Sequence, residues 1–598
     1  MAKLQNLELG VIGNCGIAAL IDREASVQWC CLPRFDGDPV FCALVDGADP
    51  GRVDGQWSIV LEGSERGEQV YEHNTAVLVT RLFASDGSAI EIVDFCPRFE
   101  ARGRMFRPQM LVRRVRRLAG RPRIRVRLRP RFGYGAVGPV ITHGSNHVRY
   151  QGPAFTLRLT TDAPVTYVLD ETAFLVDEPL NFLLGPDETI EEGLDHLARH
   201  FHESTARYWQ QWTRRLALPL EWQQAVIRAA ITLKLSTYED TGAIVAAMTT
   251  SIPEAPGTQR NWDYRYCWLR DAFFVVRALN SLSAVEAMEL YLRYFENLVV
   301  DAPDGHLQPV YGIGLERALT ERHAECLGGY RGMGPVRIGN QAYEHFQHDV
   351  YGNVILAATQ SFFDERLMRT AGHEEFARLE SVGDQAFRVH ALSDAGMWEL
   401  RTRARVHTSS TLMCWAACDR LGKIALHLGL TERAVHWQQR AEIIRAAIDT
   451  HAWNAEANSY VESFGGADVE AGLLLMVEVG FVAAQDPRFL GTLAAVENRL
   501  RRGPYLFRYA QADDFGMPET AFNICTFWYL DALAKVGRRD EARELFENML
   551  ARRNHLGLLS EDVHPQTGEL WGNYPQTYSL VGIINAATRL SRDWEDAV

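Results

Sequence analysis

Beyond residue 220 the sequence has helical periodicity almost throughout, and its helices are of two kinds. Segments such as 432–453 and 539–554 have one charged face and apolar residues at three- and four-residue spacing. Segments such as 411–429, 469–481 and 521–537 are apolar nearly all round. Helices of the first kind can border solvent, whereas helices of the second kind have to be enclosed. The second half of the chain must therefore wrap one set of helices around another.

The two kinds of helix alternate six times along the chain. We expect outer helices to begin near residues 221, 283, 364, 432, 486 and 539. We expect inner helices to begin near residues 271, 343, 410, 469, 520 and 576. Six inner helices ringed by six outer helices form an all-α (α/α)6 barrel, and two stacked helical bundles are the alternative.

The first part of the chain, up to about residue 190, has a period of two instead. Short alternating runs are separated by Gly, Pro, Asp or Asn: 76–84, 89–95, 123–132, 155–161 and 164–170. Regular short strands with turn signals predict an antiparallel β-sandwich. Helical spacing begins at about residue 188 and indicates a linker helix. The predicted organisation is an N-terminal antiparallel β-sandwich over 1–187, a linker helix over 188–220 and the barrel over 221–598.

Charge and composition exclude several classes of partner. A net charge of −14 argues against nucleic acid. The one basic run, Arg113 to Arg131, alternates with apolar residues and predicts a strand with one solvated face. No apolar segment approaches the ~20 residues of a membrane span. The ten cysteines contain no CxxC pair, and no metal site or cofactor is legible. The sequence leaves open whether the chain forms a homo-oligomer.

Two further observations bear on the compartment. The N-terminal stretch has a single Lys and an apolar run interrupted by Asn14, which makes it a poor signal peptide. Cysteines scattered through a large chain, such as Cys414 and Cys418 in an apolar helix, suit buried positions in a reducing environment. We therefore expect a cytoplasmic protein.

The alternation of helices also predicts a pocket. All outer-to-inner connections must emerge at one end of the barrel, and they carry the unusual residues, at 261–274, 328–340, 393–409, 505–520 and 557–576. The connections from inner to outer helices are short and ordinary in composition. Long loops that carry Trp, Arg and Glu on one rim predict a binding pocket. Aromatic faces with Asp, Arg and Asn between them suit a sugar, which has apolar ring faces and a belt of hydroxyls. A Gly-rich stretch at 329–335 lacks the features of a phosphate-binding loop.

Two glutamates in these loops have the settings of an acid/base pair for glycoside hydrolysis. Glu399 follows Met397 and Trp398, an apolar setting expected to raise its pKa and keep it protonated. Glu561 lies between Ser560 and Asp562, where a carboxylate is expected to stay ionised. The residues alone leave a surface or capping role as the alternative for either glutamate. For the charges within 261–274 they leave open a closed ion-pair corner or a ligand floor.

The motifs resemble those of glycoside hydrolase family 15, which contains glucoamylases, bacterial trehalases, glucodextranases and isomaltose-cleaving enzymes. The resemblance rests on NWDYRYCWLRDAFF, GYRGMGPVRIGN, GMWELR, FRYAQADDFGMPETAFNICTFW and GLLSEDVHPQTGELWGNYPQ, together with the N-terminal GNCGIAALIDREASVQWCCLPRFDGDP. It runs from about residue 10 to the end. It implies a β-sandwich, a linker, an (α/α)6 catalytic barrel and inverting hydrolysis that releases β-glucose.

The resemblance also implies residue roles. Glu399 is expected to be the general acid and Glu561 the general base, with the two carboxyl groups ~6.5–9.5 Å apart rather than the ~5 Å of a retaining pair. Arg265 and Asp263 are expected to form a supporting ion pair. The expected substrate-binding residues are Arg270 and Asp271 on the hydroxyls of the terminal glucose, Tyr264 and Trp268 as walls, Arg508 as a further sugar-binding arginine, and Arg337, Asn340 and Trp398 in the same pocket.

One departure from the family bears on the substrate. Fungal starch-cleaving members carry a second acidic residue directly after the acid, where this chain has Leu400. With no starch-binding domain or secretion signal recognised, a small cytosolic α-glucoside is expected, and trehalose is favoured for an exo-acting glucohydrolase. Isomaltose or malto-oligosaccharide hydrolysis, as in a glucoamylase, is the alternative within the family. A disaccharide phosphorylase and a non-catalytic sugar-binding protein are the alternatives from other classes.

Overall fold

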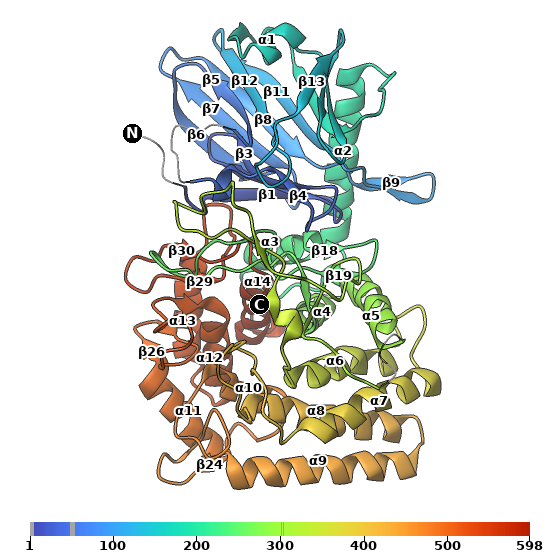
Figure 1. Cartoon of the computed structure of the whole chain (residues 1–598), viewed down its shortest axis with the longest axis vertical. Coiled ribbons are helices and arrows are strands. Elements are labelled where there is room, and N and C mark those ends of the chain that lie inside the picture. The colour runs from blue at the N-terminus through green and yellow to red at the C-terminus, as the bar shows by residue number, and fades with distance from the viewer. Residues whose placement is uncertain (1–4, 48–53, 301, 303, 598) are drawn as a thin grey trace.

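The computed structural model of the chain describes residues 5–47, 54–300, 302 and 304–597, which form a β-sandwich stacked on a helical barrel (Figure 1). One sheet contains β1 (Leu9–Gly13), β2 (Ala18–Asp22), β3 (Ser26–Leu32), β4 (Asp38–Phe41), β5 (Gln56–Leu61), β12 (Arg123–Arg129) and β16 (Phe174–Leu175). The other contains β6 (Ser64–Tyr71), β7 (Leu78–Ala84), β8 (Ala89–Phe95), β11 (Leu111–Ala119), β13 (Val140–His143), β14 (His147–Gln151), β15 (Thr156–Thr161) and β17 (Leu180–Pro186).

The strand order of the sandwich is that of two antiparallel sheets. The first runs β1-β2-β3-β5-β12-β16, with β4 paired to β3, and the second runs β13-β14-β15-β17-β11-β8-β7-β6. Their inner faces share one apolar core. The outer face of the second sheet is covered by α2 (Leu194–Thr213), the linker helix, through Phe201 and Ala206. Strand β8 is therefore buried on both faces.

Four of the five quoted alternating runs form the expected strands, namely β7, β8, β12 and β15. The alternating part of the basic run is confirmed as a strand with one solvated face, since Ile124, Val126 and Leu128 are buried and the arginines that alternate with them are not. Arg113, at the start of the run, lies instead in β11 and is buried against Asp94. The strand expected over 164–170 is wrong. The segment is the short helix α1 (Val165–Leu169), which begins after Pro164 and buries Val165 and Val168. Those two valines are three residues apart, a spacing that fits one face of a helix.

Among the residues that the structure describes, twelve barrel helices follow the linker helix, counting η4 (Ala471–Leu474) and α10 (Leu475–Glu478) as one, and outer and inner helices alternate as predicted. The inner ones are α4 (Leu269–Ser281), α6 (Asp349–Thr359), α8 (Thr408–His427), η4 with α10, α12 (Asn523–Lys535) and α14 (Thr577–Leu590). The outer ones are α3 (Gln223–Leu235), α5 (Val285–Val300), α7 (His373–Val389), α9 (Thr431–His451), α11 (Pro487–Leu500) and α13 (Arg539–Ala551). Each inner helix contacts the next, and α14 contacts α4, so the inner ring closes. The (α/α)6 barrel is confirmed.

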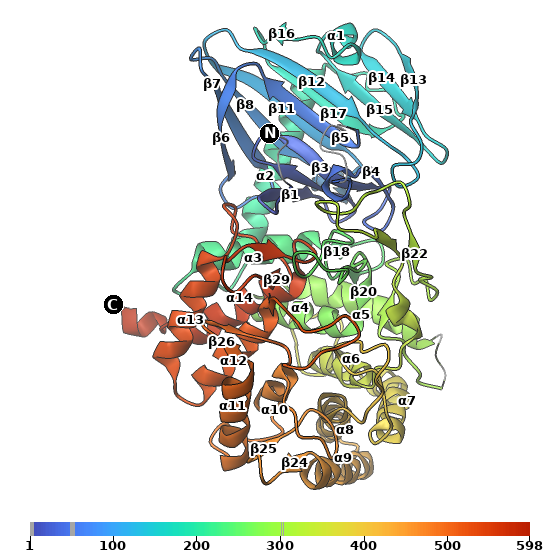
Figure 2. The ribbon, with the colours of Figure 1, turned by 60° about the vertical axis from the view of Figure 1, so that its left-hand side comes forward.

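Helix α3 departs from the simple pattern of an outer helix. Ten of its residues are buried, because the sandwich covers the face that would otherwise border solvent. It packs against α14 on one side and β1 on the other, and Figure 2 shows it between the sandwich and the barrel. Among the helices in the described ranges, none combines the length and apolarity that crossing a membrane requires.

A buried ion pair fastens the barrel to the sandwich. Arg265 and Asp263, both fully buried, lie 2.7 Å apart between Nη2 and Oδ2, which confirms the expected supporting pair. The same guanidinium donates to the carbonyl of Gly37 at 2.9 Å and to the hydroxyl of Tyr134 at 3.0 Å. Both of these partners belong to the sandwich. The two charges therefore hold the domains together rather than a ligand.

We expect the substitution Arg265→Met to destabilise the protein by about 3–5 kcal/mol, because it leaves the Asp263 carboxylate buried without its counter-charge. Tyr134→Phe removes one hydrogen bond from the same guanidinium and should cost only about 0.5–1.5 kcal/mol. Urea unfolding followed by tryptophan fluorescence measures both. Equal midpoints for the two variants would contradict this account of the interface.

Candidate active site

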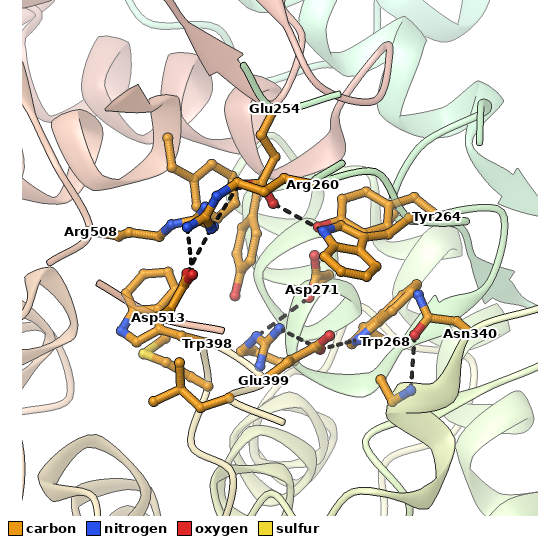
Figure 3. Close-up of a pocket in the computed structure, with 18 of the residues that line it drawn as sticks. Glu254, Arg260, Tyr264, Trp268, Asp271, Asn340, Trp398, Glu399, Arg508 and Asp513 are labelled. Carbon is orange, nitrogen blue, oxygen red and sulfur yellow. Dashed lines mark hydrogen bonds and ion pairs between the residues drawn. The ribbon is translucent and has the colours of Figure 1, made fainter. Parts of the chain in front are cut away.

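A pocket opens at the end of the barrel where the chain passes from outer to inner helices. Its lining comes from five of the six outer-to-inner connections and from the first turns of inner helices. The reverse connections, such as the one between α8 and α9, are short and contribute nothing to this lining. The prediction of a shared rim is therefore confirmed. Figure 3 shows the side chains that converge there.

The floor of the pocket is the first turn of α4, which supplies Arg270 and Asp271. The Arg270 guanidinium donates to Oε1 of Gln347 at 3.1 Å and lies 3.6 Å from the carboxylate of Glu399. Oδ2 of Asp271 is buried and has no hydrogen-bond partner among the described residues. Burial raises the pKa of Asp271 to about 7, against the opposing effect of Arg270. A buried carboxylate oxygen without a partner is an acceptor for a hydroxyl of a bound ligand.

One pair of aromatic side chains binds both candidate catalytic glutamates. The hydroxyl of Tyr264 donates to Oε1 of Glu561 at 2.7 Å, and Nε1 of Trp268 donates to Oε1 of Glu399 at 2.6 Å. The two rings meet edge to face, with their centroids 5.3 Å apart. Two glutamates far apart in the sequence are thereby bound to one aromatic pair, and both of its rings line the pocket.

Glu399 lies in the pocket lining on a strained stretch of backbone. Its φ of +60° is in the left-handed region that non-glycine residues rarely adopt. Its side chain remains 25% exposed, so Met397 and Trp398 do not enclose it as their places in the sequence suggested. The carboxylate is instead surrounded by the indole N–H of Trp268 and the guanidinium of Arg270.

The setting of Glu561 contradicts the expectation that it lies in a polar loop where its carboxylate stays ionised. The residue is 1% exposed, because its loop folds inward and is followed by β29 (Asp562–Val563), which pairs with β28 (Ala521–Phe522) and β30 (Leu570–Trp571). Burial and the nearby carboxylates of Glu254 and Asp562 raise the pKa of Glu561 well above its usual range. The Tyr264 hydrogen bond and Arg508 act in the opposite direction. Glu561 lies next to the pocket and is not among its lining residues.

A cluster of charges beside Glu561 was missed by the sequence analysis. Arg508, which was expected in the pocket and does line it, pairs with the carboxylate of Glu254. Nη1 of Arg260 donates to Oδ2 of Asp513 at 2.6 Å and lies 3.9 Å from Glu254 (Figure 3). Glu254 stands in SIPEAPG, a stretch with no motif around it, so no local signal could have identified it.

The remaining predicted residues divide into two groups. Asn340 and Trp398 line the pocket as expected, and Asn340 also begins η2 (Gln341–Glu344) by accepting from the amide of Ala342. Arg337 does not line it. Its Nη1 donates to Oε1 of Glu321 at 2.6 Å, and its guanidinium stacks 5.0 Å from the ring of Trp262. Further lining residues that the sequence analysis did not single out are His345, Arg401, Asp514, Phe515, Phe522, Trp528, Gln576 and Tyr578.

Within the described ranges, His, Cys, Asp and Glu form no group of three or more that could hold a metal ion. The pocket instead presents carboxylates, guanidinium groups and aromatic faces. That donor set binds hydroxyl-rich, uncharged molecules by hydrogen bonds and ring contacts.

Comparisons with known proteins agree with this chemistry. A model of the glycosyl hydrolases family 15 matches residues 222–588, and a model described as trehalase-like, N-terminal, matches residues 5–173. A trehalase from Thermoplasma volcanium is 30% identical over 97% of this chain and 93% of its own length. A trehalase from Mycolicibacterium smegmatis is 31% identical over 99% of this chain and 92% of its own length. A solved bacterial glucoamylase in complex with acarbose has a TM-score of 0.69 at 13% identity, covering 99% of this chain and 94% of that chain, and so has the same fold. This chain belongs to glycoside hydrolase family 15.

Proposed function

We propose that the protein is an exo-acting, inverting trehalase. The observation that carries the proposal is the Tyr264–Trp268 pair, which binds one glutamate with each side chain beside a floor built from Arg270 and Asp271. The trehalases of Thermoplasma and Mycolicibacterium, to which the chain is similar over nearly its whole length, support trehalose as the substrate.

In the proposed reaction Glu399 is the general acid. Its carboxyl group is the one at the pocket surface, where it can give a proton to the oxygen that joins the two glucose units. As the bond from that oxygen to the anomeric carbon breaks, water attacks the same carbon from the opposite face. Glu561 accepts the proton that the water loses. An acid and a base acting in this way require the two carboxyl groups to be about 6.5–9.5 Å apart, with room for the water between them.

The floor residues explain why one glucose unit would be held at the closed end. Oδ2 of Asp271, which has no hydrogen-bond partner among the described residues and lies 3.5 Å from Nε of Arg270, can accept from a hydroxyl, and Arg270 offers guanidinium N–H donors beside it. The rings of Tyr264 and Trp268 can pack against the apolar face of the sugar. The leaving glucose would then lie towards the open side of the pocket.

The anomers of the first products test the function and the stereochemistry together. Inverting hydrolysis of α,α-trehalose should give α- and β-glucose in equal amounts at first, because only the attacked carbon is inverted. A retaining enzyme would give α-glucose alone. Proton NMR of the anomeric signals, recorded before mutarotation, distinguishes these results, with isomaltose and maltose as competing substrates. Binding of all three sugars without glucose release would favour a non-catalytic sugar-binding protein.

The burial of Glu561 leads to a prediction for the pH profile. A general base has to be ionised, so kcat/KM should fall as the pH drops through its pKa. Since that pKa is raised well above 4.5, the acidic limb should lie above pH 4.5. Glu254→Gln removes a negative charge that raises the pKa of Glu561 and should move the limb to lower pH. Glu321→Gln, which removes a carboxylate paired with Arg337, should leave the limb in place. A limb that Glu254→Gln leaves unmoved or raises would contradict the role of Glu561.

A further inference from the structure

The loop that carries Glu399 is wedged between two neighbouring segments. A Cβ atom added to Gly396 would come within 2.9 Å of Nδ1 of His407, and one added to Gly472 would come within 2.7 Å of Sδ of Met397. A Cβ at Gly396 would press on the buried His407 ring, whereas one at Gly472 would require the flexible Met397 side chain to move. The segment 396–398 is thus pressed against His407 on one side and the start of η4 on the other.

Glu470 lies directly beneath this loop, immediately before η4. It is 2% exposed, and one of its carboxylate oxygens accepts a hydrogen bond from Nε1 of Trp398. The other oxygen, Oε1, is buried without a hydrogen-bond partner in the described part of the chain. Glu470 ends the connection between α9 and η4, the one outer-to-inner connection that supplies no residue to the pocket lining.

Two further buried ionisable groups, Asp394 and His407, lie near Glu470. Asp394 accepts from Nδ1 of His407 at 2.8 Å and from the hydroxyl of Ser410 at 2.6 Å, and all three are buried. His407 faces Glu470 as a favourable charge when protonated. Burial raises the pKa of Glu470 to about 7, and the His407 charge and the Trp398 hydrogen bond oppose that rise. The Asp394–His407 pair thus favours an ionised Glu470, whose carboxylate accepts from the indole of Trp398.

Trp398 transmits this arrangement to the next residue. Its ring packs against those of Tyr509, Phe522 and Trp528, each with a centroid 6.2 Å away. These three contacts restrict the position of the indole. The hydrogen bond to Glu470 fixes the orientation of the indole among these rings. Because Glu399 is joined to Trp398 by a peptide bond and has a strained φ of +60°, a shift of the Trp398 backbone displaces the Glu399 carboxyl group.

We propose that Glu470 is a positioning residue for Glu399, which it holds in line with the glycosidic oxygen through Trp398. This inference rests on the proposed function, in which Glu399 is the general acid. A displacement of about 1 Å at a catalytic group can lower a rate by about 100-fold. The loss from misplacing an acid should moreover be confined to substrates whose leaving group needs its proton.

The test compares Glu470→Leu, which leaves Nε1 of Trp398 without its acceptor, with the native chain on two substrates. Trehalose has an alkoxide leaving group that needs protonation, whereas α-glucosyl fluoride loses fluoride with little help from an acid. We expect kcat for trehalose to fall about 10- to 100-fold, within the range that general acid catalysis contributes. We expect kcat for α-glucosyl fluoride to stay within about twofold, and KM for trehalose to change little. Glucose release and fluoride release measure the two rates.

A matched control exists elsewhere in the barrel. Nε1 of Trp437, on α9, donates to Oε1 of Glu380, on α7, at 2.8 Å, the same kind of bond at a place remote from the pocket. Glu380→Leu, which removes that acceptor, should leave the ratio of the two rates unchanged. Trp398→Phe removes the donor instead of the acceptor and should reproduce the substrate selectivity of Glu470→Leu, which keeps the test available if one of the two variants fails to fold.

The outcomes separate the positioning role from the function on which it rests. If Glu399→Gln spares α-glucosyl fluoride while Glu470→Leu slows both substrates equally, or neither, the positioning role is overturned and the general acid stands. If Glu399→Gln hydrolyses trehalose at the native rate, the proposed function itself fails. Selective loss of trehalose hydrolysis in both Glu399→Gln and Glu470→Leu supports both inferences.

Discussion

Glu399→Gln is expected to lower kcat for trehalose by about 100- to 10,000-fold, the range that general acid–base catalysis contributes. The amide cannot give a proton to the glycosidic oxygen, so the leaving glucose would have to depart as an alkoxide. The side chain keeps its shape, and its carbonyl oxygen can still accept from Nε1 of Trp268. KM should therefore change little, because the loss is confined to the transition state. Initial rates of glucose release from trehalose measure the effect.

The control for this variant is Glu344→Gln. Glu344 is an exposed carboxylate at the end of η2, close in the chain to the lining residues Asn340 and Ala342, and its removal should leave kcat near the native value. A native rate in Glu399→Gln would exclude it as the acid. A large rise in KM with unchanged kcat would mean that Glu399 binds the substrate and does no acid catalysis.

The fold could be predicted from the sequence because its periodicities are unusually plain. Helix α9 has buried Trp437 and Ile444 on one side and charges on the other, whereas the first half of α8 is buried all round. The failures have local causes. The 164–170 segment alternates like a strand, but two valines at helical spacing after a proline decide in favour of α1. The burial of α3 depends on the sandwich that covers it, which the periodicity of the helix itself does not reveal.

The site was predictable only where its residues stand within motifs. Tyr264, Trp268, Arg270 and Asp271 lie within a few residues of each other and reach the pocket together. Glu254 and Glu470 stand alone in the sequence, and only the packing of distant loops brings them to the site.

Neighbours in sequence were poor guides to the environment of the two candidate catalytic carboxylates. The polar residues on either side of Glu561 are buried with it, as 0% and 1% exposures of Ser560 and Asp562 show. Met397 and Trp398 precede Glu399 but leave it partly open to solvent. The surroundings of each carboxylate depend on contacts between loops that are distant in the sequence, and neighbouring residues in the chain do not reveal these contacts.

Glu561→Gln is expected to lower kcat for trehalose by about 100- to 10,000-fold as well, because the amide cannot accept the proton that the attacking water loses. Its carbonyl oxygen can still accept from the Tyr264 hydroxyl, so the pocket should keep its shape and KM should change little. Tyr264→Phe, which leaves the carboxylate but removes its hydrogen bond, should cause a smaller loss. Native turnover in Glu561→Gln that depends on added phosphate would instead favour a disaccharide phosphorylase, which needs no base.

A nucleophile that needs no deprotonation should bypass the missing base. In Glu561→Ala, azide can attack the anomeric carbon directly while Glu399 still protonates the leaving glucose. Because azide approaches from the face that water uses, the product should be β-glucosyl azide, and the rate should rise with azide concentration. Glu399→Ala should form β-glucosyl azide from α-glucosyl fluoride but not from trehalose, since an activated leaving group needs no acid. Formation of α-glucosyl azide in Glu561→Ala would mean that Glu561 does not lie on the water side of the sugar and would exclude the inverting arrangement.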